Sequence, residues 1–183
     1  MLTIINNNII NCTKCDLHSY EKNNNNKSDI GFGKLLPKYN DSSEIMIIGL
    51  NPSRNRFPNL KYAFGGGEYF KKDKCGYKFL QIFKKYGILN KCFITNSVKC
   101  SSPINKINKK YFQYCFIHLL QEIVFCKPKL IIATGNQVYN FLKEKGIKCV
   151  KVNHPSYCFS YHFISEKEYE KQIINLLKKS LSS

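Results

Sequence analysis

The sequence predicts an α/β fold of three layers (α/β/α), in which helices cover both faces of a central, mostly parallel four-stranded sheet. Short apolar runs typical of buried parallel strands alternate along the chain with segments of helical periodicity. The length of 183 residues suits one domain, and neither an internal repeat nor a long linker divides it. We therefore expect a single domain over residues 1–183, in which residues 1–43 form an N-terminal cysteine-bearing segment and a polar loop.

Four apolar runs predict the strands. The first, at 44–49, ends in Gly49, and the others lie at 92–96, 129–135 and, more weakly, 148–152. Helical periodicity appears between and after these runs, at about 76–87, 108–125, 136–145 and 165–181. In the last segment, Ile173, Leu176 and Leu177 supply an apolar stripe and lysines supply the wet face.

Polar turn-forming segments follow three of the predicted strands. In an open parallel sheet, ligand-binding groups gather beyond the carboxyl ends of the strands. The pattern therefore predicts that Asn51, Asn96 and His154 lie along one edge of the sheet. They belong to the segments Gly-Leu-Asn-Pro-Ser at 49–53, Thr-Asn-Ser-Val-Lys-Cys at 95–100 and Asn-His-Pro-Ser at 153–156.

The chain carries a large excess of positive charge. Lys plus Arg total 29 against 12 Asp plus Glu, which gives a formal net charge of +17 and a pI of about 9.5. Only Arg54 and Arg56 are arginine and Asn is abundant, so part of the lysine excess fits an AT-rich genome. The scarcity of acids still favours a polyanionic partner such as nucleic acid. With no apolar run of ~18 residues and no secretory pattern at the start, we expect a cytoplasmic protein without a membrane partner.

Nine cysteines are present, an odd number at scattered spacings, which argues against a disulfide framework. Cys12 and Cys15 have the C-x2-C spacing of a metal-binding turn, although a redox pair or chance would explain that spacing as well. Cys100 and Cys115 lie beside predicted structured segments. The remaining five fit small core or surface residues: Cys75, Cys92, Cys126, Cys149 and Cys158.

The order of these motifs resembles the uracil-DNA glycosylase superfamily, most closely its iron–sulfur branch, family 4. The resemblance runs from Cys12 to about Ser156 and includes seven features in family order. They are C-x2-C, strand-Gly-x-x-Pro, an aromatic residue before Gly, T-N-x-V-K-C, a cysteine in the next helix, P-K-x-I-I-x-x-G and H-P-S. Each is common alone, but the ordered set is specific, and T-N-x-V-K-C at 95–100 is its strongest part.

The resemblance implies two catalytic residues, Asn51 and His154. Asn51 would order the attacking water through its side-chain carbonyl, because an amide cannot act as a general base. Here the chain departs from family 4, in which the corresponding segment resembles G-E-A-P-G. Its own segment, G-L-N-P-S, instead resembles that of the mismatch-specific thymine/uracil glycosylases. His154 would stabilise the departing base anion as an oxyanion-hole donor does. Taken alone, each residue would be interpreted as an ordinary turn or loop residue.

The same resemblance implies a base-binding set of Gly49, Phe64 and Asn96. Asn96 would pair with O4 and N3–H of a flipped uracil, and Phe64 would stack on the base. Core packing is the alternative for Phe64, and Tyr62 and Phe57 are its rivals for the stacking role. A ring just after His-Pro-Ser, Tyr157 or Phe159, is a candidate wedge for the gap left by the flipped nucleotide.

The resemblance also implies that Cys12, Cys15, Cys100 and Cys115 ligate a [4Fe–4S] cluster. Four thiolates suit zinc equally well by ligand count, and only the family resemblance favours iron. The cluster would act structurally, by fixing the N-terminal segment and the loop after the second strand near the DNA-binding face.

The implied function is that of a monofunctional DNA glycosylase that acts on DNA, as a monomer, and leaves an abasic site. No motif places a lysine as a Schiff-base nucleophile, so strand cleavage is not expected. Because of Asn51 and the triple glycine at 65–67, three substrate bases remain open: uracil, mismatched thymine, and a bulky modified cytosine in phage DNA. The alternatives are a non-catalytic DNA-binding module of the same fold and a zinc-stabilised nucleic-acid protein that flips no base.

Overall fold

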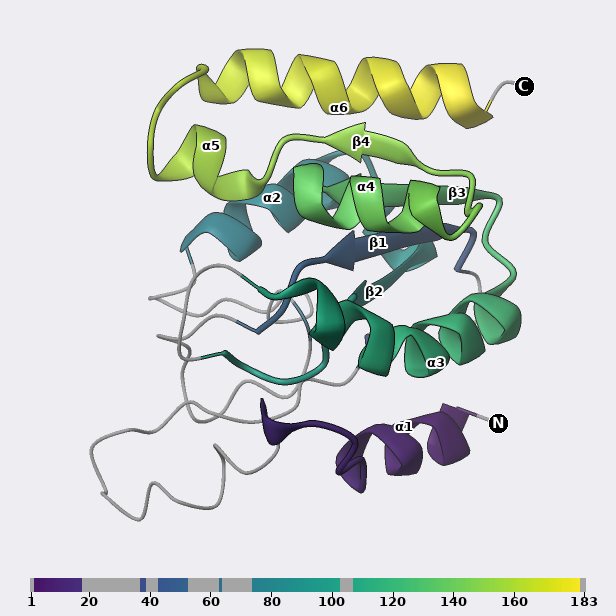
Figure 1. Ribbon diagram of the computed structural model, residues 1–183. Coiled ribbons are helices and arrows are strands. Elements are labelled where there is room, and N and C mark those ends of the chain that lie inside the picture. The colour runs from purple at the N-terminus through teal and green to yellow at the C-terminus, as the bar shows by residue number, and fades with distance from the viewer. Residues whose placement is uncertain are drawn as a thin grey trace.

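The computed structural model describes residues 2–17, 37–38, 43–52, 63, 74–102 and 107–181 (Figure 1). Within these residues a four-stranded sheet is surrounded by helices. The strands are β1 (Ile45–Gly49), β2 (Cys92–Asn96), β3 (Leu130–Thr134) and β4 (Val150–Val152). The helices are α1 (Leu2–Ile10), α2 (Lys74–Lys85), the 3-10 turn η3 (Leu89–Lys91), α3 (Lys109–Cys126), α4 (Asn136–Glu144), α5 (Pro155–Phe159) and α6 (Glu166–Leu181).

The sheet has the strand order β2-β1-β3-β4, and every neighbouring pair is parallel. Gly49 at the end of β1 is in register with Asn96 at the end of β2. All four strands therefore end at the same edge of the sheet. The predicted α/β class with a parallel four-stranded sheet is confirmed, and the predicted strands agree with the observed ones to within about two residues at each end.

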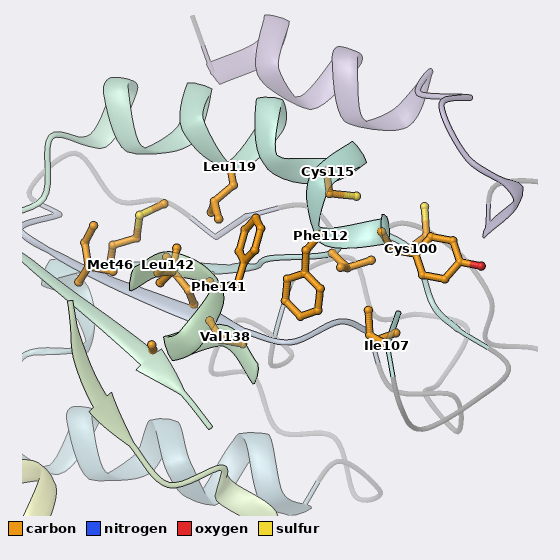
Figure 2. Close-up of a cluster of buried hydrophobic side chains, with 14 of the residues drawn as sticks. Met46, Cys100, Ile107, Phe112, Cys115, Leu119, Val138, Phe141 and Leu142 are labelled. Atoms are coloured by element: carbon orange, nitrogen blue, oxygen red, sulfur yellow. The ribbon is translucent and has the colours of Figure 1, made fainter. Parts of the chain in front are cut away.

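Helices cover both faces of the sheet, and every residue of β1, β2 and β3 is buried. Met46 and Ile48 of β1 point toward α3 and α4, where they join the core cluster drawn in Figure 2. Ile45 and Ile47 point the other way and pack with residues of α2 and α6. This alternation along one strand produces the predicted three layers.

Two helices lie outside the predicted set. Helix α1 packs on α3, away from the sheet, through Ile5 and Ile9, which contact Phe125 (Figure 1). Helix α5 is a short turn of five residues that begins at Pro155, directly after His154. Among the described residues, no helix is both long and apolar enough to cross a membrane.

Candidate active site

The ends of the four strands bring one candidate residue each to the same edge of the sheet. In spatial order these are Asn96 at the end of β2, Asn51 after β1, Gly135 after β3 and His154 after β4. Three of them are sequence-predicted site residues, and Gly135 belongs to the P-K-x-I-I-x-x-G motif. The expectation that Asn51, Asn96 and His154 share one sheet edge is therefore met by the topology.

The loops after β1 and β2 are joined by a compact set of hydrogen bonds centred on Ser97. Its hydroxyl lies 2.9 Å from the carbonyl oxygen of Gly49 and 2.8 Å from that of Leu50, and it donates to this pair of acceptors. The backbone N–H groups of Ser97 and Val98 donate to the same two carbonyls, at 2.8 and 2.9 Å. Because Gly49 and Leu50 directly precede Asn51, these bonds fix the two loops relative to each other.

The two candidate asparagines differ in their surroundings. The Asn51 side chain is half-buried, and its Nδ2 donates to the carbonyl oxygen of Pro52 at 2.9 Å. This bond uses the amide nitrogen of Asn51 and does not involve its side-chain carbonyl oxygen, which is an acceptor. Asn96 is buried and its backbone is held by the β1–β2 ladder.

His154 caps the N-terminus of α5. Its Nδ1 accepts a hydrogen bond from the backbone N–H of Ser156 at 3.2 Å and lies 2.7 Å from the Ser156 hydroxyl. An Nδ1 that accepts from an amide carries no proton, so the neutral ring has its proton on Nε2. Although the residue is exposed at the sheet edge, desolvation lowers the pKa of His154 below its ordinary value of 6.5. The neutral ring with an Nε2–H donor is the form that this arrangement favours.

Two further residues hold the segment around His154, and motif reasoning assigned a role to neither. Gly135 has φ +90°, and its backbone N–H donates to the carbonyl of Val152 at 2.8 Å. A Cβ at this position would lie 3.4 Å from Cβ of His154. The buried Tyr169 of α6 donates its hydroxyl to the carbonyl of Asn153 at 2.5 Å. The sequence signals for this pair were the glycine that ends the P-K-x-I-I-x-x-G motif and an aromatic residue in an amphipathic helix.

A buried ion pair lies directly behind the end of β2. Lys99 is 2% exposed and Glu122 of α3 is fully buried. The ammonium of Lys99 donates to both carboxylate oxygens of Glu122 at 2.7 and 2.6 Å, to the hydroxyl of Thr95 at 2.8 Å and to the carbonyl of Asn96 at 2.7 Å. The Thr95 hydroxyl in turn donates to Glu122 at 2.9 Å. Sequence reasoning missed this network, although Glu122 is the only acidic residue between 109 and 126.

The four cysteines of the implied cluster come from three segments that meet beside α3. Cys15, Cys100 and Cys115 belong to or pack against one core cluster, and Cys100 and Cys115 lie at the same end of it in Figure 2. The pKa of the Cys115 thiol is raised to about 11, chiefly by burial; a hydrogen bond from the Lys99 backbone opposes this rise, and Cys15 and Cys12 are close enough to add to it.

The donor set fits a four-thiolate centre in kind and number, but it is not gathered at ligating distances. Across the described residues, His, Cys, Asp and Glu side chains form no group of three or more that could hold a metal ion. None of the nine cysteines, all of which are described, forms a disulfide bond.

Three aromatic side chains form an exposed cluster on the segment that follows His154. Tyr157, Tyr161 and Phe163 are 38%, 66% and 65% exposed, and the Phe163 ring lies 4.9 Å from that of Tyr157 and 5.7 Å from that of Tyr161. Phe159, the other candidate wedge, instead packs edge-on against the buried Tyr169 at 5.6 Å. The candidate stacking residue Phe64, its rivals Tyr62 and Phe57, and the triple glycine at 65–67 lie outside the described residues.

Comparison with known proteins gives relatives of one kind. The chain is 30% identical over 129 residues to the type-4 uracil-DNA glycosylase of Pyrobaculum aerophilum, which covers 69% of this chain and 57% of that relative. It is 24% identical over 172 residues to the type-5 uracil-DNA glycosylase of the same organism, which covers 81% of this chain and 72% of the relative. The chain thus spans less than two thirds of the type-4 relative.

A solved structure and a family model complete the comparison. The crystal structure of wild-type Pedobacter heparinus SMUG2 shares the fold with a TM-score of 0.53 at 16% identity, over 78% of this chain and 77% of that one. The model of the uracil DNA glycosylase superfamily matches residues 36–178, which include all four strands and the three strand-end segments. The motif resemblance is thereby confirmed: this chain belongs to the uracil DNA glycosylase superfamily.

Proposed function

We propose that this protein is a DNA glycosylase that flips a uracil-like pyrimidine out of DNA and hydrolyses its N-glycosidic bond, leaving an abasic site. The observation that carries the proposal is the alignment of Asn96, Asn51 and His154 along one edge of a parallel sheet, in a chain of this superfamily. The net charge of +17 supports binding to a phosphate backbone. Cytoplasmic localisation and action as a monomer remain expectations from the sequence.

His154 supplies the donor for the departing base. When the glycosidic bond breaks, negative charge develops on the pyrimidine, and its O2 becomes a strong acceptor. With Nδ1 committed to Ser156, the Nε2–H of His154 is the ring's available donor. A neutral donor already oriented by the α5 cap stabilises this charge without reorganisation during the reaction.

The two asparagines are proposed to have different tasks: Asn96 selects the base, and Asn51 positions the attacking water. An amide held in one orientation can accept from N3–H and donate to O4 of uracil, whereas cytosine reverses both polarities, so Asn96 is proposed to read the base. Asn51 is proposed to orient the water through its side-chain carbonyl, because its Nδ2 is occupied by Pro52. This suits a dissociative cleavage with an oxocarbenium-like sugar, in which the nucleophile needs positioning more than deprotonation.

The proposed enzyme is monofunctional. Lys99 is the buried lysine beside Asn96, and its ammonium is engaged by Glu122, Thr95 and the Asn96 carbonyl. A charged, fully hydrogen-bonded ammonium is a poor nucleophile, which supports simple hydrolysis without a Schiff base or strand cleavage.

We also propose that Cys12, Cys15, Cys100 and Cys115 hold a [4Fe–4S] cluster, with zinc as the alternative. The meeting of their three segments beside α3 supports the assignment. The cluster would link the N-terminal turn and the loop after β2 to that helix. The proposal requires the thiols to close up around the metal, since they are not at ligating distances.

The exposed ring cluster is proposed to contact DNA next to the flipped nucleotide, with Tyr157 as the wedge. Its place directly after His154 and its exposure support this role, whereas Phe159 is occupied by the core. Removing the ring in Tyr157→Ala should lower the rate on double-stranded DNA more than on single-stranded DNA, because single strands need no wedge. Equal losses on both substrates would assign Tyr157 to another task.

The decisive experiment incubates the protein with oligonucleotides that carry uracil, a thymine mismatch or a modified cytosine, followed by alkali to cut at abasic sites. Release of uracil supports the proposal in its main form, and release of only a bulky cytosine assigns the alternative substrate. Strand cleavage before alkali would contradict the monofunctional mechanism. Binding to all of these DNAs without release of any base would refute the enzyme and leave a DNA-binding module.

A further inference from the structure

A contribution to stability alone does not account for the buried ion pair between Lys99 and Glu122. A buried ion pair is costly to desolvate, and well-packed apolar residues of similar size often serve stability equally well or better. This pair contacts neither solvent nor the exposed edge of the candidate site. It does, however, contact the backbone of Asn96 and the side chain of Thr95, the last two residues of β2.

We propose that Lys99 is a positioning residue that fixes the direction of the Asn96 side chain and thereby sets base selectivity; this inference rests on the proposed function. The β1–β2 ladder holds Asn96 on one side, with Gly49 in register. On the other side, the Lys99 ammonium holds the Asn96 carbonyl at 2.7 Å. With the peptide groups on both sides of its Cα held, the direction of the Cα–Cβ bond of Asn96 is fixed, and with it the region that its amide can reach.

Glu122 completes this arrangement by holding Lys99 in place. Both of its carboxylate oxygens accept from the ammonium, and the Thr95 hydroxyl bridges the two groups by accepting from Lys99 and donating to Glu122. Because Glu122 belongs to the 18-residue helix α3, near its C-terminal end, the reference point for the β2 end is a regular element of the fold. The charged ammonium of Lys99 has three N–H donors, which together serve Glu122, the Thr95 hydroxyl and the Asn96 carbonyl; a neutral amine would have only two.

The same network extends to the loop that carries Asn51. Residue 97 follows Asn96 directly, and its hydroxyl and N–H clamp the carbonyls of Gly49 and Leu50. If Lys99 releases the Asn96 carbonyl, the hydrogen bonds of Ser97 and Val98 lose part of their support. Loosening at Lys99 should therefore reach both candidate asparagines while the distant α5 cap at His154 is left unaffected.

The test replaces both charges at once, in Lys99→Met/Glu122→Met, with the wild-type protein beside it. Each single replacement should lower the thermal unfolding midpoint, because it leaves an unpaired buried charge. The double variant leaves no charge unpaired, but the Asn96 carbonyl loses its donor, so its midpoint should lie between those of the single variants and that of the wild type. In the folded double variant, the single-turnover rate on uracil DNA should fall by about 10- to 100-fold and the ratio of uracil to cytosine release should fall with it.

The matched control is the ion pair at the opposite edge of the same sheet. Lys129 donates to Glu44 at 2.6 Å, where both residues precede their strands and both are exposed. Lys129→Gln/Glu44→Gln should keep the rate and the uracil-to-cytosine ratio. Thr95→Val is the milder second variant: it removes only the bridging hydroxyl, with its bonds to Lys99 and Glu122, and keeps the ion pair, so the ratio should fall by only about 2- to 10-fold.

A second measurement separates this inference from the proposed function. Hydrogen exchange of the Ser97 and Val98 amides reports the clamp directly, and exchange should speed up in the double variant and in Thr95→Val but not in the control. Faster exchange together with a reduced ratio supports the positioning role. An unchanged ratio in folded variants, or unchanged exchange at these two amides, overturns it. If the wild-type protein releases no base at all, the proposed function fails, and amide exchange alone decides whether Lys99 positions the loop.

Discussion

Replacing Tyr169 by phenylalanine removes one buried hydroxyl group and leaves the ring in place. That hydroxyl donates to the carbonyl of Asn153, the residue before His154, over 2.5 Å. The ring itself packs against Phe79 and Phe159, so Tyr169→Phe keeps the aromatic contacts of α6 with the core. Burial raises the pKa of the Tyr169 hydroxyl above its ordinary value of 10.0, so it remains a donor throughout the neutral pH range.

The expected loss follows from a buried acceptor that is left without its donor. Such a change costs about 1–3 kcal/mol, and the half-buried position of Asn153 favours the lower part of this range, about 1–2 kcal/mol. For a domain of this size, that corresponds to a fall in the thermal midpoint of about 2–8 °C. Because the Asn153 carbonyl fixes the entry into the His154 turn, turnover on uracil DNA should also fall about 10-fold.

The assay combines calorimetric unfolding with single-turnover kinetics on a uracil oligonucleotide. Tyr161→Phe is the matched control for stability, since it removes the same hydroxyl group from a residue that is 66% exposed. Its unfolding free energy should stay within about 0.5 kcal/mol of wild type. A Tyr169→Phe variant that melts with the Tyr161→Phe control and turns over at the wild-type rate would show that the hydroxyl does not hold the His154 segment.

Three further predictions concern the same edge of the sheet and the cysteines. Because desolvation lowers the pKa of His154, the single-turnover rate should stay constant as the pH falls to 6.5 and should decrease only at lower pH. The folded protein should also lose stability below about pH 6.5, because there the unfolded chain takes up the proton first. An NMR titration midpoint of His154 at or above 6.5 would contradict both expectations. Gly135→Ala and Gly146→Ala both strain a backbone at positive φ, and each should lower the free energy of unfolding by about 1–3 kcal/mol. Only Gly135→Ala should slow base release, because its Cβ would contact His154, whereas a Cβ at position 146 would have no atom within 4 Å. Equal rates of base release in the two variants would rule out an effect of this contact. In anaerobically purified protein, Cys115→Ser should abolish bound iron and the associated absorption, whereas the control Cys149→Ser should retain both. Metal analysis that finds no iron in the wild-type protein, or finds zinc instead, would reject the iron–sulfur assignment.

The sheet and its functional edge could be predicted because their signals are local. Each strand is a run of apolar residues with a polar turn behind it, and parallel pairing brings the turns together without any knowledge of side-chain contacts. Helix α1 was not predicted because its run of asparagines has poor helix propensity, and only the spacing of Ile5 and Ile9 indicated a buried face. Helix α5 is too short for periodicity, although a proline at its first position was an available signal.

The supporting contacts could not be predicted because they join residues far apart in sequence. Lys99 and Glu122 are 23 positions apart, and Tyr169 lies 16 positions after Asn153. Nothing in a motif shows that a lysine beside a cysteine turns inward to meet a helix. Between the two candidate wedges, sequence position alone could not separate Tyr157 from Phe159, since only the packing of Phe159 on Tyr169 shows which ring remains exposed.

The two outer strands have consequences for behaviour at high concentration. An open sheet exposes unpaired backbone groups along its outer strands, and these can recruit strands of other chains into aggregates. Along β2, Lys38 covers part of this edge through a pair of antiparallel bridge bonds with Ile94, at 2.9 and 2.8 Å. At the other side, β4 has only three residues and carries the exposed Lys151 at its centre. One edge is therefore occupied and the other is short and charged, which disfavours edge-to-edge association of neighbouring molecules.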